Sequence, residues 1–267
     1  MKTLLRRVPG VRRAYIQMLK IYSASRQVPG LLEWNTSPKR WASYRRFRAL
    51  HNKHRGQRCF IVGNGPSLNQ TDLSLLQNEY TITTNRAYLM YERMGGPSSY
   101  YVSINVNVIN QFAEDIAQLP MPKFLNWATH KNANFTDSTI FIRTVQDFDF
   151  SFQPQHFLYE GSTVTYAAMQ IAYYLGFQQV ILIGVDHNFV TKGDPNKKVV
   201  SEGSDPNHFD PNYFGKGIVW QLPDLEGSER AYQRAKEVYE QDGREIVDAT
   251  IDGKLQIYRK VAYSSLF

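Results

Sequence analysis

The stretch RCFIVGNGPSLNQTDLSLL, residues 58–76, decides the fold of this chain. It begins with the composition of a buried strand, continues through a loop that contains Gly63, Asn64, Gly65 and Pro66, and ends in a polar cap and a short helical pattern. A strand, a glycine loop and a helix in this order are typical of phosphate-binding sites. The spacing matches neither the dinucleotide motif GxGxxG nor the GxxxxGK motif of P-loop enzymes. The stretch therefore indicates a nucleotide-binding sheet with a loop of a different kind.

Short strand-like runs alternate with helical patterns from residue 58 onward. We expect strands at residues 58–63, 80–85, 98–105, 122–127, 138–143, 178–186 and 244–250. The helical patterns fall at residues 86–94, 106–119, 163–176 and 227–243. This alternation predicts an α/β fold, namely a Rossmann-like open, mostly parallel sheet with helices on both faces.

Residues 187–225 interrupt the alternation. They are rich in Gly, Pro, Asn and Asp and are much longer than an ordinary connection, so they form either a functional lid or a disordered insertion. Their aromatic residues argue against pure disorder. The segment follows the expected strand 178–186, at the sheet edge where doubly wound folds bind ligands. We expect a nucleotide-binding domain at 57–267 with a lid at 187–225, preceded by a basic, partly helical arm at 1–56.

Cysteine content and hydropathy indicate a cytoplasmic protein. Cys59 is the one cysteine, which excludes an internal disulfide framework and a cysteine-rich zinc site. The sequence has no run of 18 apolar residues and no N-terminal secretory signal pattern. We therefore expect a reducing, cytoplasmic environment.

The positive charge is concentrated at the N-terminus. Residues 1–58 contain 15 Lys or Arg and one acid, Glu33, whereas the remainder of the chain carries a net charge of −7. Apolar and aromatic residues occur among these basic residues at roughly helical spacing. The arm at 1–56 can lie on an anionic membrane surface, peripheral to the inner face of the membrane, or pack on the domain or on a second subunit of a homo-oligomer. We expect no nucleic-acid partner, because no recognised binding module accompanies the charge.

The glycine loop offers backbone and amide groups to a ligand. Gly63 and Gly65 let a ligand approach the backbone closely, and Asn64 presents an amide between them. Ser67 can cap the helix that follows, whose N-terminus favours an anion. The alternative is a tight turn from strand to helix that binds nothing.

Two further asparagines end the next two expected strands. Asn85 closes the strand 80–85 and Asn105 closes the strand 98–105. With Asn64 they can hydrogen-bond a base, a ribose hydroxyl or a phosphate without adding charge, although an asparagine at such a place can also only cap the next helix. Three of them at successive strand ends predict a neutral, amide-lined pocket.

The second half of the domain contains a candidate phosphate site and a candidate acid. Gly161, Ser162 and Thr163 open the helical pattern 163–176, where free N–H groups and two hydroxyls suit a phosphate, or simply cap the helix. Asp186 ends the strand 178–186, where its carboxylate can contact a ligand or a metal, or cap the lid.

Two histidines are candidate proton acceptors. His208 lies within the expected lid, and a neutral imidazole can remove a proton from a hydroxyl group near neutral pH. His187 directly follows Asp186 and has the same chemistry. A lone histidine in a loop is more often a surface residue.

The motifs FIVGNGPSL, TTNRAYL, VSIN, GSTVTYAAMQIAYYLGFQQVILIGVD and NHFDPNYFGKG together resemble one enzyme superfamily. It contains the sialyltransferases of glycosyltransferase family 42 and the MptE-like 6-hydroxymethyl-dihydropterin diphosphokinases. The resemblance extends over roughly residues 57–262 and implies a transferase that uses a nucleotide-activated donor. By similarity to the sialyltransferases, the donor contacts would be Asn64, Gly65, Ser67, Asn85, Asn105, Ser162 and Thr163.

The same resemblance implies a mechanism. His208 matches the general base that takes the proton of the acceptor hydroxyl. The sialyltransferases also have two tyrosines after the GxD strand end that stabilise the departing phosphate, whereas the run DHNFVTKGDP here has none. His187 or Lys192 would then take that place, and the sequence departs there from the pattern of the enzymes that transfer sialic acid.

Three functions follow from these observations. The first is a glycosyltransferase of glycan or surface polysaccharide synthesis, which uses a nucleotide-sugar, CMP-linked by preference, with a glycan acceptor and no required cofactor or metal. The second is an MptE-like diphosphokinase that uses ATP and Mg²⁺, with Asp186 as the leading metal ligand. The third is a nucleotide-binding protein without catalytic activity.

Overall fold

The structure is a computed structural model that describes residues 30, 32–132, 136–190 and 193–267. It divides into two compact units, Met1–Ala42 and Ser43–Phe267, and helix α2 (Pro38–Arg48) runs through their boundary. The second unit contains the sheet and the candidate site.

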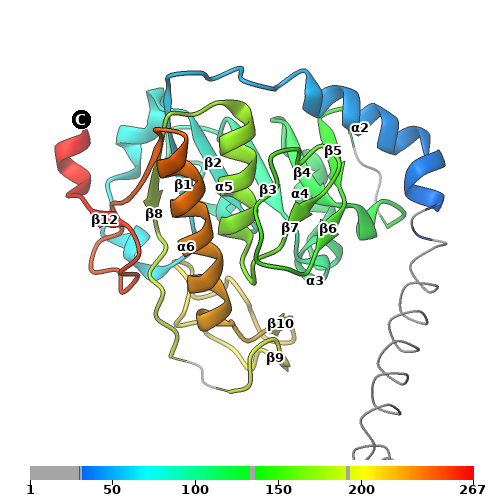
Figure 1. Cartoon of the computed structure of the whole chain (residues 1–267). Coiled ribbons are helices and arrows are strands. Elements are labelled where there is room, and N and C mark those ends of the chain that lie inside the picture. Colours follow the sequence, from blue (N-terminus) through cyan, green and yellow to red (C-terminus); the bar gives the residue numbers. More distant parts are fainter. Residues whose placement is uncertain (1–29, 31, 133–135, 191–192) are drawn as a thin grey trace, which may run out of the picture. The chain divides into compact units, whose positions relative to one another are not determined.

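A parallel sheet forms the centre of the second unit, and within the described residues it has eight strands in the order β12-β11-β8-β1-β2-β3-β4-β5. The chain builds β1 to β5 in one direction and then places β8, β11 and β12 on the other side of β1 (Figure 1). The winding therefore reverses between β1 and β8. The strands are β1 (Arg58–Val62), β2 (Thr81–Thr84), β3 (Tyr100–Ser103), β4 (Lys123–Asn126), β5 (Thr139–Ile142), β8 (Gln179–Ile183), β11 (Glu245–Asp248) and β12 (Arg259–Lys260).

This sheet confirms the predicted Rossmann-like α/β fold. The seven expected strands are all present, and every pair in the central sheet is parallel. Central strands of such a sheet are buried on both faces, so their sequences read as continuous apolar runs. In β1, for example, Cys59 and Ile61 belong to one buried cluster while Phe60 and Val62 belong to the other.

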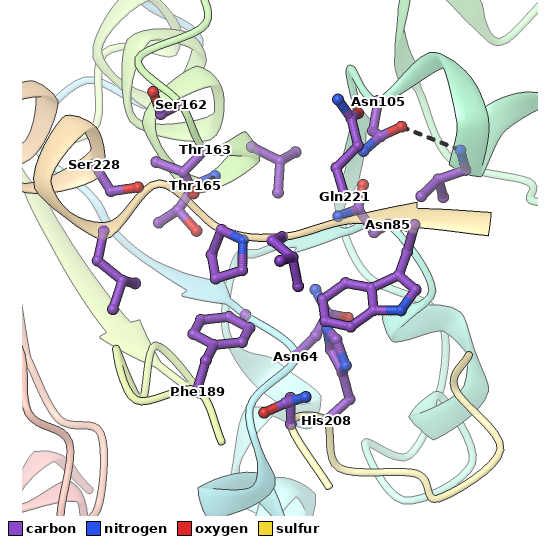
Figure 2. Close-up of a pocket in the computed structure, with 18 of the residues that line it drawn as sticks. Asn64, Asn85, Asn105, Ser162, Thr163, Thr165, Phe189, His208, Gln221 and Ser228 are labelled. Carbon is purple, nitrogen blue, oxygen red and sulfur yellow. Dashed lines mark hydrogen bonds between the residues drawn. The ribbon is translucent and has the colours of Figure 1, made fainter. Parts of the chain in front are cut away.

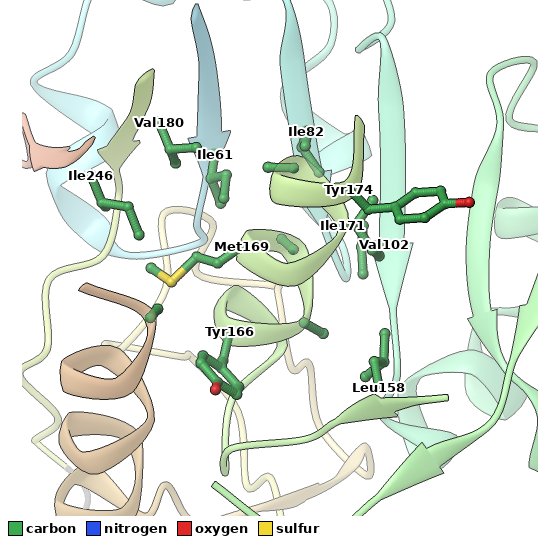
Figure 3. Packing of buried hydrophobic residues seen from close by; sticks show 14 of the residues in the cluster. Ile61, Ile82, Val102, Leu158, Tyr166, Met169, Ile171, Tyr174, Val180 and Ile246 are labelled. Carbon is green, nitrogen blue, oxygen red and sulfur yellow. The ribbon is translucent and has the colours of Figure 1, made fainter. Parts of the chain in front are cut away.

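Helices α5 (Val164–Leu175) and α6 (Leu225–Gln241) cover the first face of the sheet (Figure 1). Figure 3 shows Met169 and Ile171 of α5 among the apolar side chains of the strands. Each large apolar side chain buried in this way contributes about 1.5–3 kcal/mol. Packing against the sheet therefore fixes the start of α5, which belongs to the candidate site.

The second face is covered mainly by short helices and by the lid. The loop after β1 continues into two 3-10 helices, Pro66–Asn69 and Leu73–Asn78, where the sequence shows a short helical pattern. Asp72 accepts a hydrogen bond from the Ser74 N–H and thereby starts the second of them. The expected helix at 86–94 is likewise a 3-10 helix, Ala87–Met90, followed by turns.

The expected helix at 106–119 is broken into α3 (Val106–Gln111) and α4 (Ala113–Gln118). Phe112 separates them with φ −124° and ψ 32°, outside the helical region. Its ring centroid lies 4.0 Å from the guanidinium carbon of Arg86. The break therefore coincides with a cation–π contact that helical periodicity does not reveal.

The loops after β1 and β8 are joined by backbone hydrogen bonds. The Gly63 N–H donates to the Ile183 carbonyl at 2.8 Å, and the Gly65 N–H donates to the Gly184 carbonyl at 2.9 Å. A Cβ on Gly63 would lie 2.3 Å from the Gly184 oxygen. Close approach of the two loops thus explains a glycine at position 63, and the amides of Gly63 and Gly65 are both bonded to the end of β8 and the loop that follows it.

Asp186 completes this junction. Its Oδ1 accepts from the Ser67 N–H at 2.9 Å and its Oδ2 from the Ser67 hydroxyl at 2.7 Å. Burial raises the pKa of Asp186, whereas the hydrogen bonds from Ser67 act in the opposite direction. A Cβ on Gly65 would lie 1.8 Å from Oδ2, so only glycine fits above the carboxylate.

Lys123 is fully buried at the start of β4. Its ammonium group donates to the carbonyls of Ala117 and Leu119 and to the Thr136 hydroxyl, at 3.1, 2.6 and 2.9 Å. The lysine therefore binds carbonyls at the end of α4. Burial lowers its pKa to about 8.

Gly65→Ala is expected to destabilise the protein by about 1–3 kcal/mol, because the new methyl group overlaps the Asp186 carboxylate. Urea unfolding measures the change in the free energy of unfolding. Gly203→Ala is the matched control, since a Cβ there meets nothing within 4 Å. A Gly65→Ala protein as stable as the control would contradict this role of Gly65.

Lys123→Met is expected to change how stability depends on pH. Native Lys123 loses its proton near pH 8, whereas an unfolded lysine holds it to about pH 10.4. The unfolded chain therefore binds more protons between these values, and the wild type gains stability relative to Lys123→Met as the pH rises through this window. Urea unfolding midpoints of both proteins, measured below and above pH 8, give this stability difference. A difference that does not change with pH would disprove the lowered pKa of Lys123.

Candidate functional site

A cavity of about 530 Å³ lies at the carboxyl ends of the central strands, where the winding of the sheet reverses. Ligands bind at this position in doubly wound folds, and the volume is within the range of small-molecule sites. Its walls come from the loops after β1, β2, β3 and β8, from the starts of α5 and α6, and from the lid.

Most of the predicted site residues meet in this cavity. The lining includes Gly63, Asn64, Gly65, Asn85, Asn105, Ser162, Thr163, Asp186, His187 and His208. Ser67 and Gly161 are not part of it. Ser67 is bound to Asp186, and a Cβ on Gly161 would lie 2.3 Å from the ring of Tyr166, so both have structural roles. Lys192 lies outside the described residues.

The three predicted asparagines each use one end of the amide to hold the structure. The Asn64 Nδ2 donates to the Thr84 hydroxyl at 2.9 Å, and the Asn85 Oδ1 accepts from the Ser103 hydroxyl at 3.0 Å. The Asn105 Oδ1 caps α3 by accepting backbone N–H groups. The structural role, which the sequence left as one of two alternatives, is therefore present in all three side chains, and it occupies one end of each amide.

The other ends of these amides have no hydrogen-bond partner among the described residues. The Asn64 Oδ1 is buried and unpaired, and no bond is formed by the NH₂ groups of Asn85 and Asn105. Further cavity asparagines escaped sequence analysis, among them Asn126, which ends β4 and was recognisable by the same pattern. The Asn126 amide is already bonded at both ends.

Hydroxyl groups form the opposite wall. Figure 2 shows Ser162, Thr163, Thr165 and Ser228 on one side of the cavity and Asn85, Asn105 and Gln221 on the other. Thr163 caps α5, and Asp224 caps α6. The Ser162 hydroxyl donates to the Asp224 Oδ2 at 3.0 Å, which ties the two helix starts together.

Four non-glycine residues of the cavity have a left-handed backbone. Asn85, Ser162, His187 and Asn196 have φ of 49°, 60°, 53° and 63°. This conformation is unfavourable for serine and histidine and is commonly found at functional sites. For Ser162 and His187 this backbone is a local cost that the surrounding structure must offset.

His208 forms a hydrogen-bonded pair with Asp205, which sequence analysis missed. The His208 Nδ1 lies 2.7 Å from the Asp205 Oδ2, and the exposed fractions of the two side chains are 13% and 4%. The imidazole stacks on Tyr213 with a centroid distance of 4.0 Å. In the sequence, the run DPNH places an aspartate three residues before the histidine, and this spacing could have indicated the pair.

His187 forms a different pair. Its Nε2 lies 3.0 Å from the Glu229 Oε1, and the Glu229 side chain is 53% exposed. Both histidines therefore line the cavity, but only the partner of His208 is buried.

The charge of the cavity is low. Lys198 of β9 (Lys198–Val200) is its one Lys or Arg within the described residues, and Glu160 and Asp186 supply carboxylates. Among those residues, no three His, Cys, Asp or Glu are arranged to bind a metal. Asp186 is already bound to Ser67, so a magnesium ion would have to be held largely by the phosphates of a nucleotide.

The lid is ordered around a two-stranded antiparallel ribbon of β9 and β10 (Val219–Gln221). The Gln111 side chain of α3 pairs with the Val219 backbone: its Nε2 donates to the carbonyl at 2.8 Å and its Oε1 accepts from the N–H at 2.9 Å. The segment 187–225 is therefore a structured wall of the cavity over its described part.

The structure describes residues 30 and 32–56 of the N-terminal arm, and the rest of the arm lies outside the described residues. Contact with a membrane or a second subunit stays a prediction. None of the helices in the described part of the chain is long and apolar enough to cross a bilayer.

Comparison with known proteins identifies the family. Residues 36–192, more than half of the chain, match the family model described as 6-hydroxymethylpterin diphosphokinase MptE-like. No curated protein matches the chain. The structure of the MAf glycosyltransferase from Magnetospirillum magneticum AMB-1 is similar, with a TM-score of 0.48 and 15% identity over 85% of this chain and 39% of that chain. This chain thus spans well under half of that glycosyltransferase. By its family match, the chain belongs to the MptE-like family.

Proposed function

We propose that this protein transfers a group from a nucleotide-activated donor to a hydroxyl group of an acceptor. The observation that carries the proposal is the composition of the cavity at the sheet reversal: an amide wall, a hydroxyl wall and a histidine paired with a buried carboxylate. A nucleotide-sugar is the donor that we favour, with a single phosphate as in a CMP-linked sugar and with a glycan acceptor.

The two walls suit the two ends of a nucleotide. Asn64, Asn85 and Asn105 provide neutral amide groups for a base and ribose. Thr163 provides a hydroxyl at the start of α5, where the helix dipole favours the phosphate, and the neighbouring Ser162 holds that helix start to Asp224.

The chemistry follows from a displacement at the anomeric carbon. The acceptor oxygen forms a bond to that carbon while the bond from the carbon to the phosphate oxygen breaks. His208 accepts the proton of the acceptor hydroxyl, and the nucleotide departs with an additional negative charge. Lys198 is the described lysine available to stabilise that charge, in addition to the predicted His187 or Lys192.

The family supports a second candidate, a diphosphokinase that uses ATP and Mg²⁺. A nucleoside triphosphate would bring about four negative charges at neutral pH beside Glu160 and Asp186. Because Lys198 is the one described lysine or arginine of the cavity, such a donor needs magnesium to offset its charge. Asp186 is the leading candidate for a carboxylate ligand of that magnesium ion. The low positive charge of the cavity is the reason for preferring a donor with one phosphate.

Thermal shift with a panel of nucleotides tests the proposal. CMP and CMP-linked sugars are expected to raise Tm without magnesium, because a ligand that binds only the native state stabilises it. CMP, UDP, GDP and ATP are compared with and without magnesium, and a pterin is added in a further sample. A response confined to magnesium–ATP with pterin would replace the glycosyltransferase by the diphosphokinase. Stabilisation without turnover of any donor would leave a nucleotide-binding protein.

Lys198→Ala is expected to weaken CMP binding about tenfold and to leave cytidine binding unchanged, because the lysine meets the phosphate and not the base. Isothermal titration calorimetry measures both affinities, and added salt should reduce the difference. Lys197→Ala is the matched control, since the neighbouring Lys197 is exposed and does not line the cavity. Equal losses in the two variants would remove Lys198 from the site.

A further inference from the structure

We infer that Asp205 is a positioning residue that fixes the tautomer of His208 and makes its Nε2 the proton acceptor of the site. The inference rests on the proposed transfer to a hydroxyl group, and it holds for either donor. Its basis is the arrangement of His208, Asp205 and Tyr213 in the lid.

The hydrogen bond between the two residues defines the tautomer. A carboxylate can only accept, so the His208 Nδ1 carries the proton and donates it to the Asp205 Oδ2 at 2.7 Å. The Nε2 of a neutral ring then has a free electron pair. No hydrogen bond to Nε2 is formed by any described residue, and His208 lines the cavity. The ring is thus prepared to accept a proton there.

The lid also fixes the plane of the ring. His208 stacks on Tyr213 with an angle of 1° between the rings, and it contacts Phe214 edge-on at a centroid distance of 5.0 Å. Tyr213 is fully buried, and its hydroxyl accepts the Arg86 N–H. Rotation of the imidazole about the bond that joins it to Cβ would therefore break these contacts.

Asp205 is held as firmly as the ring. Its Oδ1 accepts from the Asn207 N–H at 2.9 Å, and its own N–H donates to the Pro211 carbonyl at 2.8 Å. One carboxylate oxygen, Oδ1, thus bonds the loop backbone, and the other, Oδ2, bonds the histidine. A group fixed in this manner orients its partner before a substrate binds.

The second histidine of the cavity provides an internal comparison. His187 uses Nε2, not Nδ1, to contact Glu229, whose side chain is 53% exposed against 4% for Asp205. An exposed ion pair in water contributes little, whereas a buried carboxylate acts at close range in a low dielectric. Asp205 can therefore stabilise a positive ring much more strongly than Glu229 can.

The proton balance of the step is simple. As the acceptor oxygen forms its new bond to the transferred group, its O–H bond breaks and the proton moves to the His208 Nε2. The imidazolium that results is paired with the Asp205 carboxylate, which does not itself take the proton. The proton leaves to water after the nucleotide has departed.

Asp205→Asn tests the positioning role with nearly unchanged shape. The Asn207 N–H still requires an acceptor, so the asparagine oxygen stays there and its NH₂ group faces the Nδ1. The ring must then carry its proton on Nε2, where it cannot accept another. We expect His208 to change from the Nδ1–H to the Nε2–H tautomer, as seen in two-bond ¹H–¹⁵N spectra of the ¹⁵N-labelled full chain without substrate.

The spectra can be assigned and controlled within the same chain. His208→Gln identifies the His208 signal among the six histidines. Glu229→Gln is the matched control, which should leave the His208 tautomer unchanged. Retention of the Nδ1–H tautomer in Asp205→Asn, or an Nε2–H tautomer in the wild type, would overturn the inference. Amide spectra of each variant report whether the lid is still folded.

Kinetics supply the second measurement once a donor is known from the panel. Asp205→Asn is expected to lower kcat by about 10²–10⁴-fold with little change in KM, since the ring is misprotonated but the walls of the cavity are intact. A rise in KM alone would show a structural role and overturn the inference. A tautomer change in a protein that accepts no donor would instead count against the proposed function while the positioning stands.

Discussion

The junction between the loops after β1 and β8 is the constraint on which the rest of the site depends. Asp186 binds Ser67 twice, and Gly65 passes above the carboxylate with no room for a side chain. This contact closes the crevice at the reversal of the sheet on the side where many folds place phosphates. Ligand-binding groups must therefore come from side chains and from the opposite wall, and the distribution of amides and hydroxyls in the cavity follows this division.

The candidate site is lined by side chains whose orientation the fold already fixes. The amides of Asn85 and Asn105 are fixed at one end by Ser103 and by the start of α3. Thr163 both caps α5 and faces the cavity. Little conformational entropy is then lost when a ligand binds, because these side chains already have one orientation. Holding Ser162 and His187 in a left-handed backbone costs conformational energy, and this cost accompanies the fixed arrangement of the cavity.

The sequence predicted the sheet and ten of the residues that line the cavity, because apolar strands and the polar residues that end them are local patterns. It did not predict the 3-10 helices or the break at Phe112, since a contact such as that between Phe112 and Arg86 joins residues far apart in the chain. The roles of Ser67 and Asp205 were missed for a related reason. Each is defined by a partner across a loop or a turn, and residue type alone does not show which partner a hydroxyl or a carboxylate will meet.

The Gln111 side chain has a consequence for the behaviour of the chain in solution. A two-stranded ribbon at a surface presents backbone groups that readily pair with a strand of another molecule. The Gln111 side chain bonds both the N–H and the carbonyl of Val219, as a neighbouring strand would at that residue. At that position the lid can remain a thin, accessible ribbon without offering a template for intermolecular β-sheet.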